Sequence, residues 1–499
     1  MKMLPLMFIY RFESVLIVLF IVLSVFFFSA VSLLAKIYLF SLILLLLLIR
    51  LVVTTTMQDT SAIYTKSLLG LVLLAYLYLN SNIAKIPFEA KVEYLNFNLY
   101  IATFLLFSLL QARGLNREIK ISFLIITTVL FLLRILLGEK IVYFFVYNPN
   151  ILAGTCLAIT LYIVGDVVEK KEIGFTEITI LFMSVLLLIL SGSYSSIFIM
   201  IALFLYSIFK TKHLAILVIV SIAIIGIFLN FTSVVDRLIW NVIGIKVWLR
   251  NIFFGVGLGN FKFLYPTYLK DINVLPSTAT IFVHNYFINL LSEIGFVGIL
   301  IFSLLVYAVL KQRDRCYAYI YPVYGMLAHN LVDYNLLIPQ NGILFFMFLG
   351  LKTWKTQFFS RNGGTKRFFN TICFLGILIT IFGLFSCFKL QKIFNIISSD
   401  KIEEIKKIVS SDETCWYAWK KLAIKAMVSG NTVEAEDMFI KTIQTNPYEA
   451  DSYFYLAVIS FKNGYRQKAY QYLKTVVLLQ PRLSGRYIRM FKNFVINTN

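Results

Sequence analysis

The sequence predicts an all-α membrane protein, in which a bundle of about thirteen membrane-spanning helices precedes a smaller soluble helical domain. Of its 499 residues, 60% are hydrophobic and only 14% are charged, whereas a soluble domain has about half apolar and about a quarter charged residues. The apolar residues form runs of about twenty, the length that crosses a hydrocarbon core about 30 Å thick at about 1.5 Å per residue. Beyond Ser399 these runs stop, and the composition becomes that of a soluble domain.

The hydrophobic runs follow one another along the chain, and a long polar interval separates the ninth from the tenth. Each run is expected to be a helix, because lipid offers no hydrogen-bond partner to an open backbone. The runs cover residues 13–34, 37–54, 67–81, 98–112, 119–137, 150–168, 176–191, 195–209, 213–231, 287–310, 316–333, 341–358 and 368–388. Together they define a polytopic membrane domain over residues 1–390.

Lysine and arginine residues in the short loops orient the runs, because cytoplasmic loops carry an excess of positive charge. Lys2 and Arg11 place the N-terminus in the cytoplasm. The other positive clusters fall on the same side, at residues 113–120, 210–212, 311–315 and 352–367. The odd number of runs then places the loop 232–286 and the C-terminal domain outside the cytoplasm. These short loops account for most of the net charge of +21, so nucleic acid is not an expected partner.

Two segments of the C-terminal domain, residues 400–495, repeat with a period of 34 residues. The matched positions are Trp419 and Tyr453, Leu422 and Leu456, Gly430 and Gly464, Ala435 and Ala469, and Pro447 and Pro481. The pattern resembles the tetratricopeptide repeat, with small residues where paired helices touch and proline closing the unit. Two repeats are few for such a stack, so it is expected to be capped by the flanking segments Ile402–Val409 and Leu483–Val495 or by the membrane. The domain is predicted to present a partner or an acceptor; the alternative is a structural cap on the membrane domain.

Four polar clusters fall on the outer side in this topology, although none of them was used to assign it. They are Asn148–Asn150 before the sixth run, Ser191–Ser195 between the seventh and eighth, the loop 232–286, and His329–Tyr334 at the end of the eleventh. Charged groups and histidines are costly near a membrane, so their convergence indicates a functional site.

The same clusters carry a family resemblance. NPNILA at 148–153, SGSYSS at 191–196, Arg237-x-x-Trp240, GVGLGNF at 255–261 and HNYFINLLSEIG at 284–295 follow in order. Their order and spacing resemble the O-antigen ligase and polymerase family of bacterial membrane glycosyltransferases, over roughly residues 100–360. HNLVDYNLLIP at 329–339 and the C-terminal repeats resemble the subgroup with an appended tetratricopeptide domain.

This resemblance implies a reaction. A glycan on undecaprenyl diphosphate passes to an acceptor hydroxyl on the outer face of the cytoplasmic (inner) membrane, and the lipid diphosphate is released. The acceptor is a glycan, a lipid or a protein, as in cell-surface polysaccharide or glycoconjugate biosynthesis. The family implies no cofactor, no nucleotide sugar and no metal at this step. The helical repeats are also a candidate surface for a protein partner.

Such a reaction needs a base, and His284 is the candidate because imidazole titrates near neutrality. The alternative is a histidine that caps the tenth run. Asn285, next to it, is a candidate substrate contact. His329 is predicted to orient another group of the site or to lie on the acceptor side. Asp333 is predicted to orient His329, since the two are four residues apart on one helical face.

The diphosphate needs cations, and Arg237 is the best candidate, because guanidinium binds phosphate oxygens bidentately and stays charged. The family resemblance implies the same role, and the alternative is an arginine that reaches the membrane surface. Lys246 and Arg250 follow on an amphipathic stretch with an apolar stripe of Leu238, Val242, Ile245 and Leu249. They are either secondary phosphate contacts or membrane-surface anchors.

One position departs from the family pattern: Tyr194 stands where the family usually has an arginine. Arg134, near the outer end of the fifth run, is the proposed spatial replacement. Asn148 and Asn150 are candidates for hydrogen bonds to sugar or diphosphate; the alternative for Asn150 is helix capping. The glycines of GVGLGN are expected to form a tight turn that brings backbone close to the lipid headgroup.

Two other classes of function compete with an enzyme. A transporter or flippase would show inverted repeats and charged residues deep within several spans, which the membrane runs do not display. A scaffold that only displays the helical repeats would leave the loop residues without a purpose. Among enzymes, the residues do not separate a polymerase, a ligase and a protein O-oligosaccharyltransferase.

Overall fold

The computed structural model describes residues 3–26, 32–53, 61–110, 114–138, 148–209, 231–269, 276, 280–311, 316–352 and 364–498. All regular secondary structure in these ranges is helical. Within them, eight helices are long and apolar enough to cross a membrane, and three shorter apolar helices accompany them. The protein is therefore an all-helical membrane protein, as predicted. The predicted run 213–231 falls outside the described residues up to position 230.

The membrane domain consists of α1 to α8 and α10 to α15. Their bounds are α1 Met3–Phe26, α2 Leu33–Val53, α3 Ser61–Ile83, α4 Pro87–Leu110, α5 Asn116–Leu137, α6 Pro149–Lys170, α7 Phe175–Leu190, α8 Tyr194–Phe209, α10 Phe231–Leu249, α11 Phe261–Tyr268, α12 Tyr286–Leu310, α13 Tyr317–His329, α14 Pro339–Leu351 and α15 Gly364–Ser398. Two bounds differ from the prediction in a way that matters. The helix predicted over 98–112 begins at Pro87, and the one predicted over 316–333 ends at His329.

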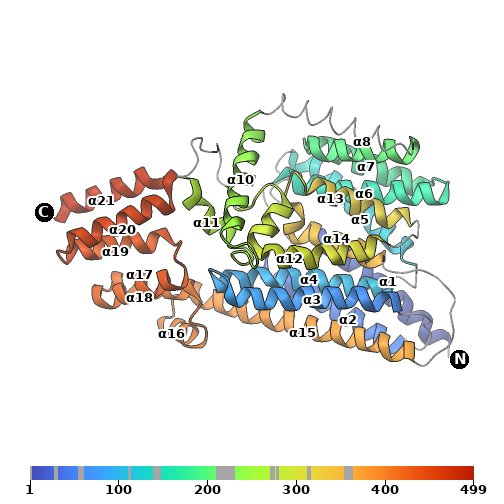
Figure 1. Ribbon diagram of the computed structural model, residues 1–499. Coiled ribbons are helices and arrows are strands. Elements are labelled where there is room, and N and C mark those ends of the chain that lie inside the picture. Colours follow the sequence, from blue (N-terminus) through green and yellow to red (C-terminus); the bar gives the residue numbers. More distant parts are fainter. Residues whose placement is uncertain are drawn as a thin grey trace.

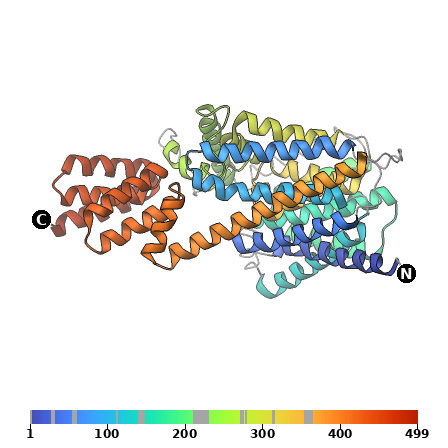
Figure 2. The same cartoon turned by 90° about the horizontal axis from the view of Figure 1, so that it is seen from below.

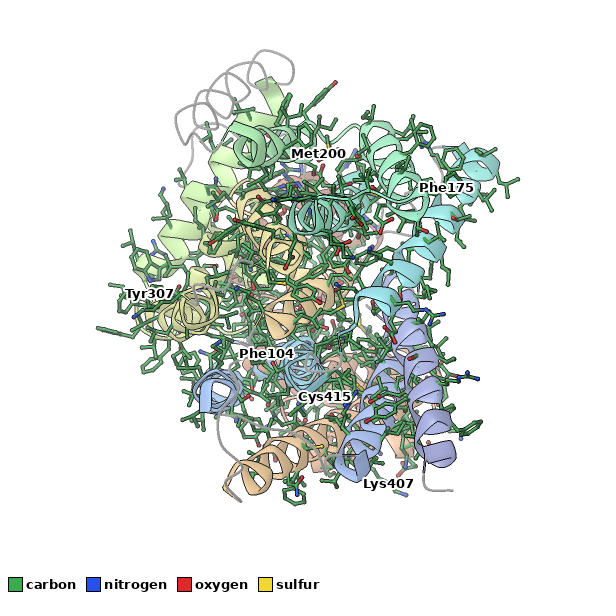
Figure 3. The ribbon with its side chains drawn as sticks, turned by 90° about the vertical axis from the view of Figure 1, so that its right-hand side faces the viewer. Phe104, Phe175, Met200, Tyr307, Lys407 and Cys415 are labelled. Atoms are coloured by element: carbon green, nitrogen blue, oxygen red, sulfur yellow. The ribbon has the colours of Figure 1, made fainter. Side chains whose placement is uncertain are left out.

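Most of these helices run along one long axis, and α10 crosses it at one end (Figures 1 and 2). Helices α4 and α14 form the centre, where nearly every residue is buried. Tyr100 of α4 stacks on Phe346 of α14 with ring centroids 5.4 Å apart. A view along the axis shows Phe104 in the middle and Tyr307 and Phe175 at the periphery (Figure 3). Apolar side chains on the outside are what a surface in contact with lipid requires.

The C-terminal domain is a stack of six helices: α16 Ile402–Ser411, α17 Trp416–Val428, α18 Thr432–Thr445, α19 Ala450–Lys462, α20 Arg466–Leu479 and α21 Ser484–Thr498. From Trp416 to Ala450, and from Thr432 to Arg466, the helix starts repeat after 34 residues. Gly430 and Gly464 occupy the same place in the two turns, with φ of 82° and 83°. Helix α16 packs on α17 and α21 packs on α20, so the flanking segments cover the two ends of the four central helices.

The C-terminal domain packs against the membrane domain at the end that carries α10 and α11 (Figure 1). Glu89, at the start of α4, is buried there between two partners. Its carboxylate accepts a hydrogen bond from Trp416 Nε1 at 3.3 Å and pairs with Lys262 Nζ at 2.9 Å. Arg482 also donates to the carbonyl of Pro276. One carboxylate thus joins α4, α11 and α17.

Replacing Glu89 with alanine should loosen this junction, because a hydrogen bond to a charged group contributes about 1.5–3 kcal/mol. We expect amide hydrogens at the start of α17 to exchange about tenfold faster. Hydrogen–deuterium exchange in lipid nanodiscs measures this. The matched control is Glu436→Ala, which removes an exposed pair with Lys468 at 2.9 Å. Equal exchange in the two variants would contradict the role of Glu89.

Candidate active site

The structure brings the four polar clusters together. Asn148 Nδ2 donates to the Tyr334 hydroxyl at 2.7 Å, and Asn150 Nδ2 donates to Asp333 Oδ2 at 2.6 Å. The serine turn, residues 191–196, joins the site through Ser196, whose Oγ lies 3.0 Å from His329 Nε2. The loop before α12 joins through His284, whose ring meets that of Tyr334 edge-on at 4.7 Å. Segments far apart in the sequence therefore form one site.

Asp333 is at the centre of this site and is fully buried. One carboxylate oxygen, Oδ1, accepts from the Tyr334 amide at 2.8 Å and lies 3.9 Å from His284 Nδ1. The other, Oδ2, accepts from Asn150 and lies 4.0 Å from Arg237 Nη2. The carboxylate thus faces both the candidate base and the candidate phosphate-binding cation.

The predicted pairing of Asp333 with His329 is wrong. Helix α13 ends at His329, so the two residues do not share a helical face. His329 is fully buried, and its ring nitrogens lie 3.0 Å from Ser196 Oγ and 3.0 Å from Asn335 Nδ2. A side chain enclosed in this way does not reach an acceptor. His329 instead connects α8 to the segment after α13, and its partners Ser196 and Asn335 come from separate elements that no sequence spacing links.

Asn285, and not His284, caps helix α12. The Asn285 side-chain oxygen accepts from the amides of Phe287 and Ile288 at 3.0 and 3.1 Å, and its Nδ2 donates to the Leu331 carbonyl at 2.8 Å. Capping by His284 is therefore excluded. The side-chain oxygen and nitrogen of Asn285 are thus both hydrogen-bonded within the protein. Asn285 therefore has a structural role in place of the predicted substrate contact. The capping alternative for Asn150 is also wrong, since Asn148 is the N-cap of α6.

His284 lies between two aromatic rings, with 15% of its side chain exposed. Its ring stacks on Trp240 with centroids 4.5 Å apart and planes 24° apart. Its Nδ1 is buried and has no hydrogen-bond partner within the described residues. Burial, helped by the positive charge of Arg237 and opposed by Asp236, lowers the pKa of His284 from its ordinary value of 6.5 to about 3. The imidazole is therefore neutral at pH 7 and able to accept a proton.

This pKa predicts a loss of stability in acid. The unfolded chain takes up the histidine proton below about pH 6.5, but the folded protein does so only near pH 3. The contribution of His284 is therefore fully present above about pH 6.5 and is lost as the pH falls toward 3. At pH 5 the loss should be about 2 kcal/mol, at about 1.4 kcal/mol per pH unit. Thermal unfolding at pH 7.5 and pH 5 should show a smaller difference for His284→Gln than for the wild type. The same difference in both proteins would assign the effect to other groups.

Arg237 extends from α10 toward the end of α13. Its Nη1 donates to the Val332 carbonyl at 3.0 Å, and 27% of its side chain remains exposed. This exposure leaves the guanidinium accessible to an anion. Lys246 lies about 13 Å and Arg250 about 20 Å further along the helix axis. Arg250 stands over the Tyr268 ring at 4.8 Å. Lys246 and Arg250 are therefore not brought to the carboxylate of Asp333.

The apolar stripe on α10 is exposed at Leu238, Val242, Ile245 and Leu249. Because α10 crosses the bundle axis (Figure 1), this exposed stripe favours the membrane-surface interpretation of the amphipathic stretch over secondary phosphate contacts.

Tyr194 and Arg134 lie at the serine turn. The Tyr194 ring is 51% exposed and stacks on Phe198 of its own helix at 6.3 Å. Arg134 donates to the Leu190 carbonyl at 3.4 Å and to the Gly138 carbonyl at 3.0 Å. Its guanidinium thus lies beside the residue that precedes the turn. Whether Arg134 takes over from the missing arginine stays a prediction.

The glycine segment forms turns, as predicted, and its backbone packs against α12. The backbone of α12 breaks at Gly295, where φ is 67°. The amides of Phe296 and Val297 donate to Ile252 and Phe253, and the carbonyls of Ser292 and Glu293 accept from Val256 and Gly257. A Cβ atom on Gly295 would lie 2.3 Å from the Phe253 oxygen, and one on Gly255 would lie 2.4 Å from the Glu293 backbone. The glycines permit this contact between two backbones.

No protein-family model matches this chain, and no curated protein matches it. Within the described residues, no group of three His, Cys, Asp or Glu side chains could hold a metal ion. A neutral imidazole, a buried carboxylate and a partly exposed guanidinium can together accept a proton and bind an anion.

Proposed function

We propose that the protein is a glycosyltransferase of the cytoplasmic (inner) membrane. It transfers a glycan from undecaprenyl diphosphate to an acceptor hydroxyl on the outer face. The observation that carries this proposal is the shared carboxylate of Asp333, which faces His284 Nδ1 at 3.9 Å and Arg237 Nη2 at 4.0 Å. A base and a cation for a diphosphate leaving group are thereby held in one site.

The step balances without a further reactant. The acceptor hydroxyl gives its proton to His284 while its oxygen bonds to the anomeric carbon of the glycan. The bond from that carbon to the diphosphate oxygen breaks, and Arg237 binds the released diphosphate. Asp333 stabilises the imidazolium that forms. The distance of 3.9 Å is longer than a hydrogen bond, as is common for a catalytic pair before substrate binds.

The donor also carries a long apolar chain, for which the membrane domain has a surface. A groove of about 570 Å³ lies between α6, α7 and α8, and nearly all of its walls are apolar. Met200, labelled in Figure 3, is in its lining and lies one turn after Ser196 on α8. The groove thus extends away from the polar site along the surface of the bundle.

We also propose a topology of thirteen spans with a cytoplasmic N-terminus and an extracytoplasmic tetratricopeptide-like domain. This topology agrees with the charges in the loops and with the 34-residue period.

One observation favours a protein acceptor, and with it a protein O-oligosaccharyltransferase. The C-terminal domain packs at the end of the bundle that carries α10, and α10 also contributes Arg237.

A transfer assay tests this function. Purified protein in nanodiscs is given a labelled oligosaccharide on undecaprenyl diphosphate, together with a glycan, a lipid or a protein acceptor. Extension of the glycan would identify a polymerase, and label on lipid or protein would identify a ligase of that type. A variant with both His284 and Asp333 replaced by alanine is the inactive control. Binding of the donor without turnover on any acceptor would contradict the proposal and favour transport or a scaffold.

A further inference from the structure

The long helix α15 shows where the membrane surface lies. It has 35 residues, so it is about 50 Å long and exceeds the hydrocarbon core of about 30 Å. An exposed apolar stripe runs along it and ends with Phe385 and Phe388, which are 69% and 58% exposed. Exposed polar residues follow at once, beginning with Lys389. The hydrocarbon boundary therefore falls close to Phe388, and the last turns of α15 lie at the level of the lipid headgroups.

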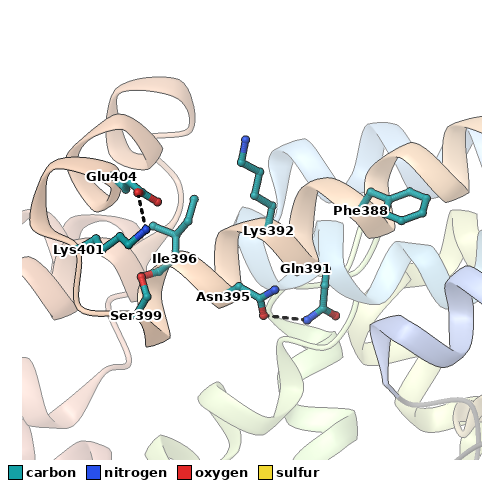
Figure 4. Close-up of a pocket in the computed structure, with 8 residues that line it drawn as sticks. All are labelled: Phe388, Gln391, Lys392, Asn395, Ile396, Ser399, Lys401 and Glu404. Carbon is teal, nitrogen blue, oxygen red and sulfur yellow. Dashed lines mark hydrogen bonds and ion pairs between the residues drawn. The ribbon is translucent and has the colours of Figure 1, made fainter.

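A cavity of about 440 Å³ opens at this level, where α15 passes into α16 (Figure 4). Phe388 marks its end nearest the membrane, and Lys392, Asn395 and Ser399 line it from α15 and the turn. Lys401 and Glu404 line it from the start of α16. The lining therefore changes from apolar to cationic and polar along the direction in which a phospholipid changes from chain to headgroup.

The charges around the cavity leave Lys392 available to an anion. Lys392 is exposed, and no carboxylate lies within ion-pair distance of it among the described residues. Lys401 shares its charge with Glu404 at 3.0 Å. The neighbouring Asp400 does not compete for Lys392, because it pairs with Lys421 and with Lys425, the latter at 2.9 Å.

Hydrogen-bond donors complete the lining. Gln391 Nε2 donates to Asn395 Oδ1 at 3.0 Å, which leaves the amide nitrogen of Asn395 outside that bond. Two lysines, Lys392 and Lys401, and Asn395 thus line one cavity, against the single carboxylate of Glu404. Such a set suits a singly charged phosphodiester better than a cation.

We propose that this cavity binds the phosphate of a membrane phospholipid, with the acyl chains along the stripe that ends at Phe388. Lys392 is the main cationic partner and Lys401 the second. The site is separate from His284 and Arg237 and does not depend on glycan transfer. A bound lipid would hold together the end of α15 and the start of α16, the point at which the C-terminal domain leaves the membrane.

Native mass spectrometry of the purified full chain tests this, with phosphatidylglycerol as the probe. The wild type should retain one tightly bound lipid, and Lys392→Gln should weaken its binding about tenfold, as expected for one charge-assisted contact. The matched control is Lys389→Gln, which removes a charge at the same depth but outside the lining. Lys441→Gln, on the exposed surface of α18, removes one far from the membrane end of α15. Lys392 is exposed, so its variant should fold, and circular dichroism checks this.

Three results would overturn the proposal. Equal weakening by Lys389→Gln and Lys392→Gln would show only general attraction of lysines to a charged membrane. Unchanged lipid binding in Lys392→Gln would exclude the site. A thermal stabilisation by inorganic phosphate that equals that by phosphatidylglycerol, and is lost in Lys392→Gln, would show a site for free anions instead of lipid.

Discussion

Replacing His284 with alanine should slow glycan transfer by about 10²–10⁴-fold, the usual contribution of a positioned general base. Among the described residues of the site, the imidazole is the proposed acceptor of the proton, and Asp333 supports the charge that forms. Donor binding should change little, because Arg237 still faces the diphosphate. The measurement is the rate of transfer at saturating donor, with donor binding followed separately.

The fold of this variant needs its own control, since His284 stacks between Trp240 and Tyr334. His284→Gln fills more of the space than alanine and removes the base equally. Loss of activity in both variants, with normal unfolding temperatures, supports the role of a base. Transfer at the wild-type rate in either folded variant would exclude it.

Replacing Arg237 with alanine should lower transfer by about 10²–10³-fold, the usual effect of removing one preorganised donor to a developing charge. Unlike the change at His284, it should also weaken donor binding. Arg237→Lys should recover only part of the activity, because ammonium does not bind two phosphate oxygens in a fork. Arg250→Ala is the matched control on the same amphipathic stretch and should leave transfer close to normal.

A second readout separates the charge of Arg237 from its packing. Its positive charge is one cause of the low pKa of His284, so Arg237→Ala should raise that pKa. NMR of labelled histidine follows this in a chain with three histidines. Normal donor binding and an unchanged titration of His284 in the alanine variant would contradict the assignment.

Arg134 provides a comparison at the serine turn. If it replaces the arginine expected at Tyr194, Arg134→Ala should also reduce transfer, by about tenfold for one charge-assisted contact. The same transfer assay measures this. Intact transfer in Arg134→Ala, beside its loss in Arg237→Ala, would exclude the replacement.

The sequence predicted that the four polar clusters meet, because hydrophobic runs and loop charges place them on one side. It did not predict the partner of Asp333. The spacing of His329 and Asp333 predicts that the two share one helical face, but the helix ends at His329. One tertiary and one local contact hold this turn: the Tyr286 amide donates to the carbonyls of Asn330 and Asp333, and the Leu336 amide donates to Asn330 Oδ1. The first joins distant segments, and neither leaves a periodic pattern.

The glycine segment shows the same limit. Three glycines at alternate positions predict a turn, because glycine readily adopts positive φ. All three do so in the structure. They do not reveal what the turn contacts. The partner is a break in α12 at Gly295, and a single glycine in a hydrophobic run does not indicate that a helix opens there.

The exchange of backbone hydrogen bonds between the glycine segment and α12 has a consequence for how a lipid substrate is captured. Arg237 precedes the glycine segment, and His284 lies between that segment and the break at Gly295, so backbone hydrogen bonds within the protein hold the segments next to both residues. Ordering a loop around a ligand would cost about 1–2 kcal/mol of conformational entropy per residue. Here that entropy is lost when the chain folds. For the donor proposed above, binding should therefore not have to order these two described segments.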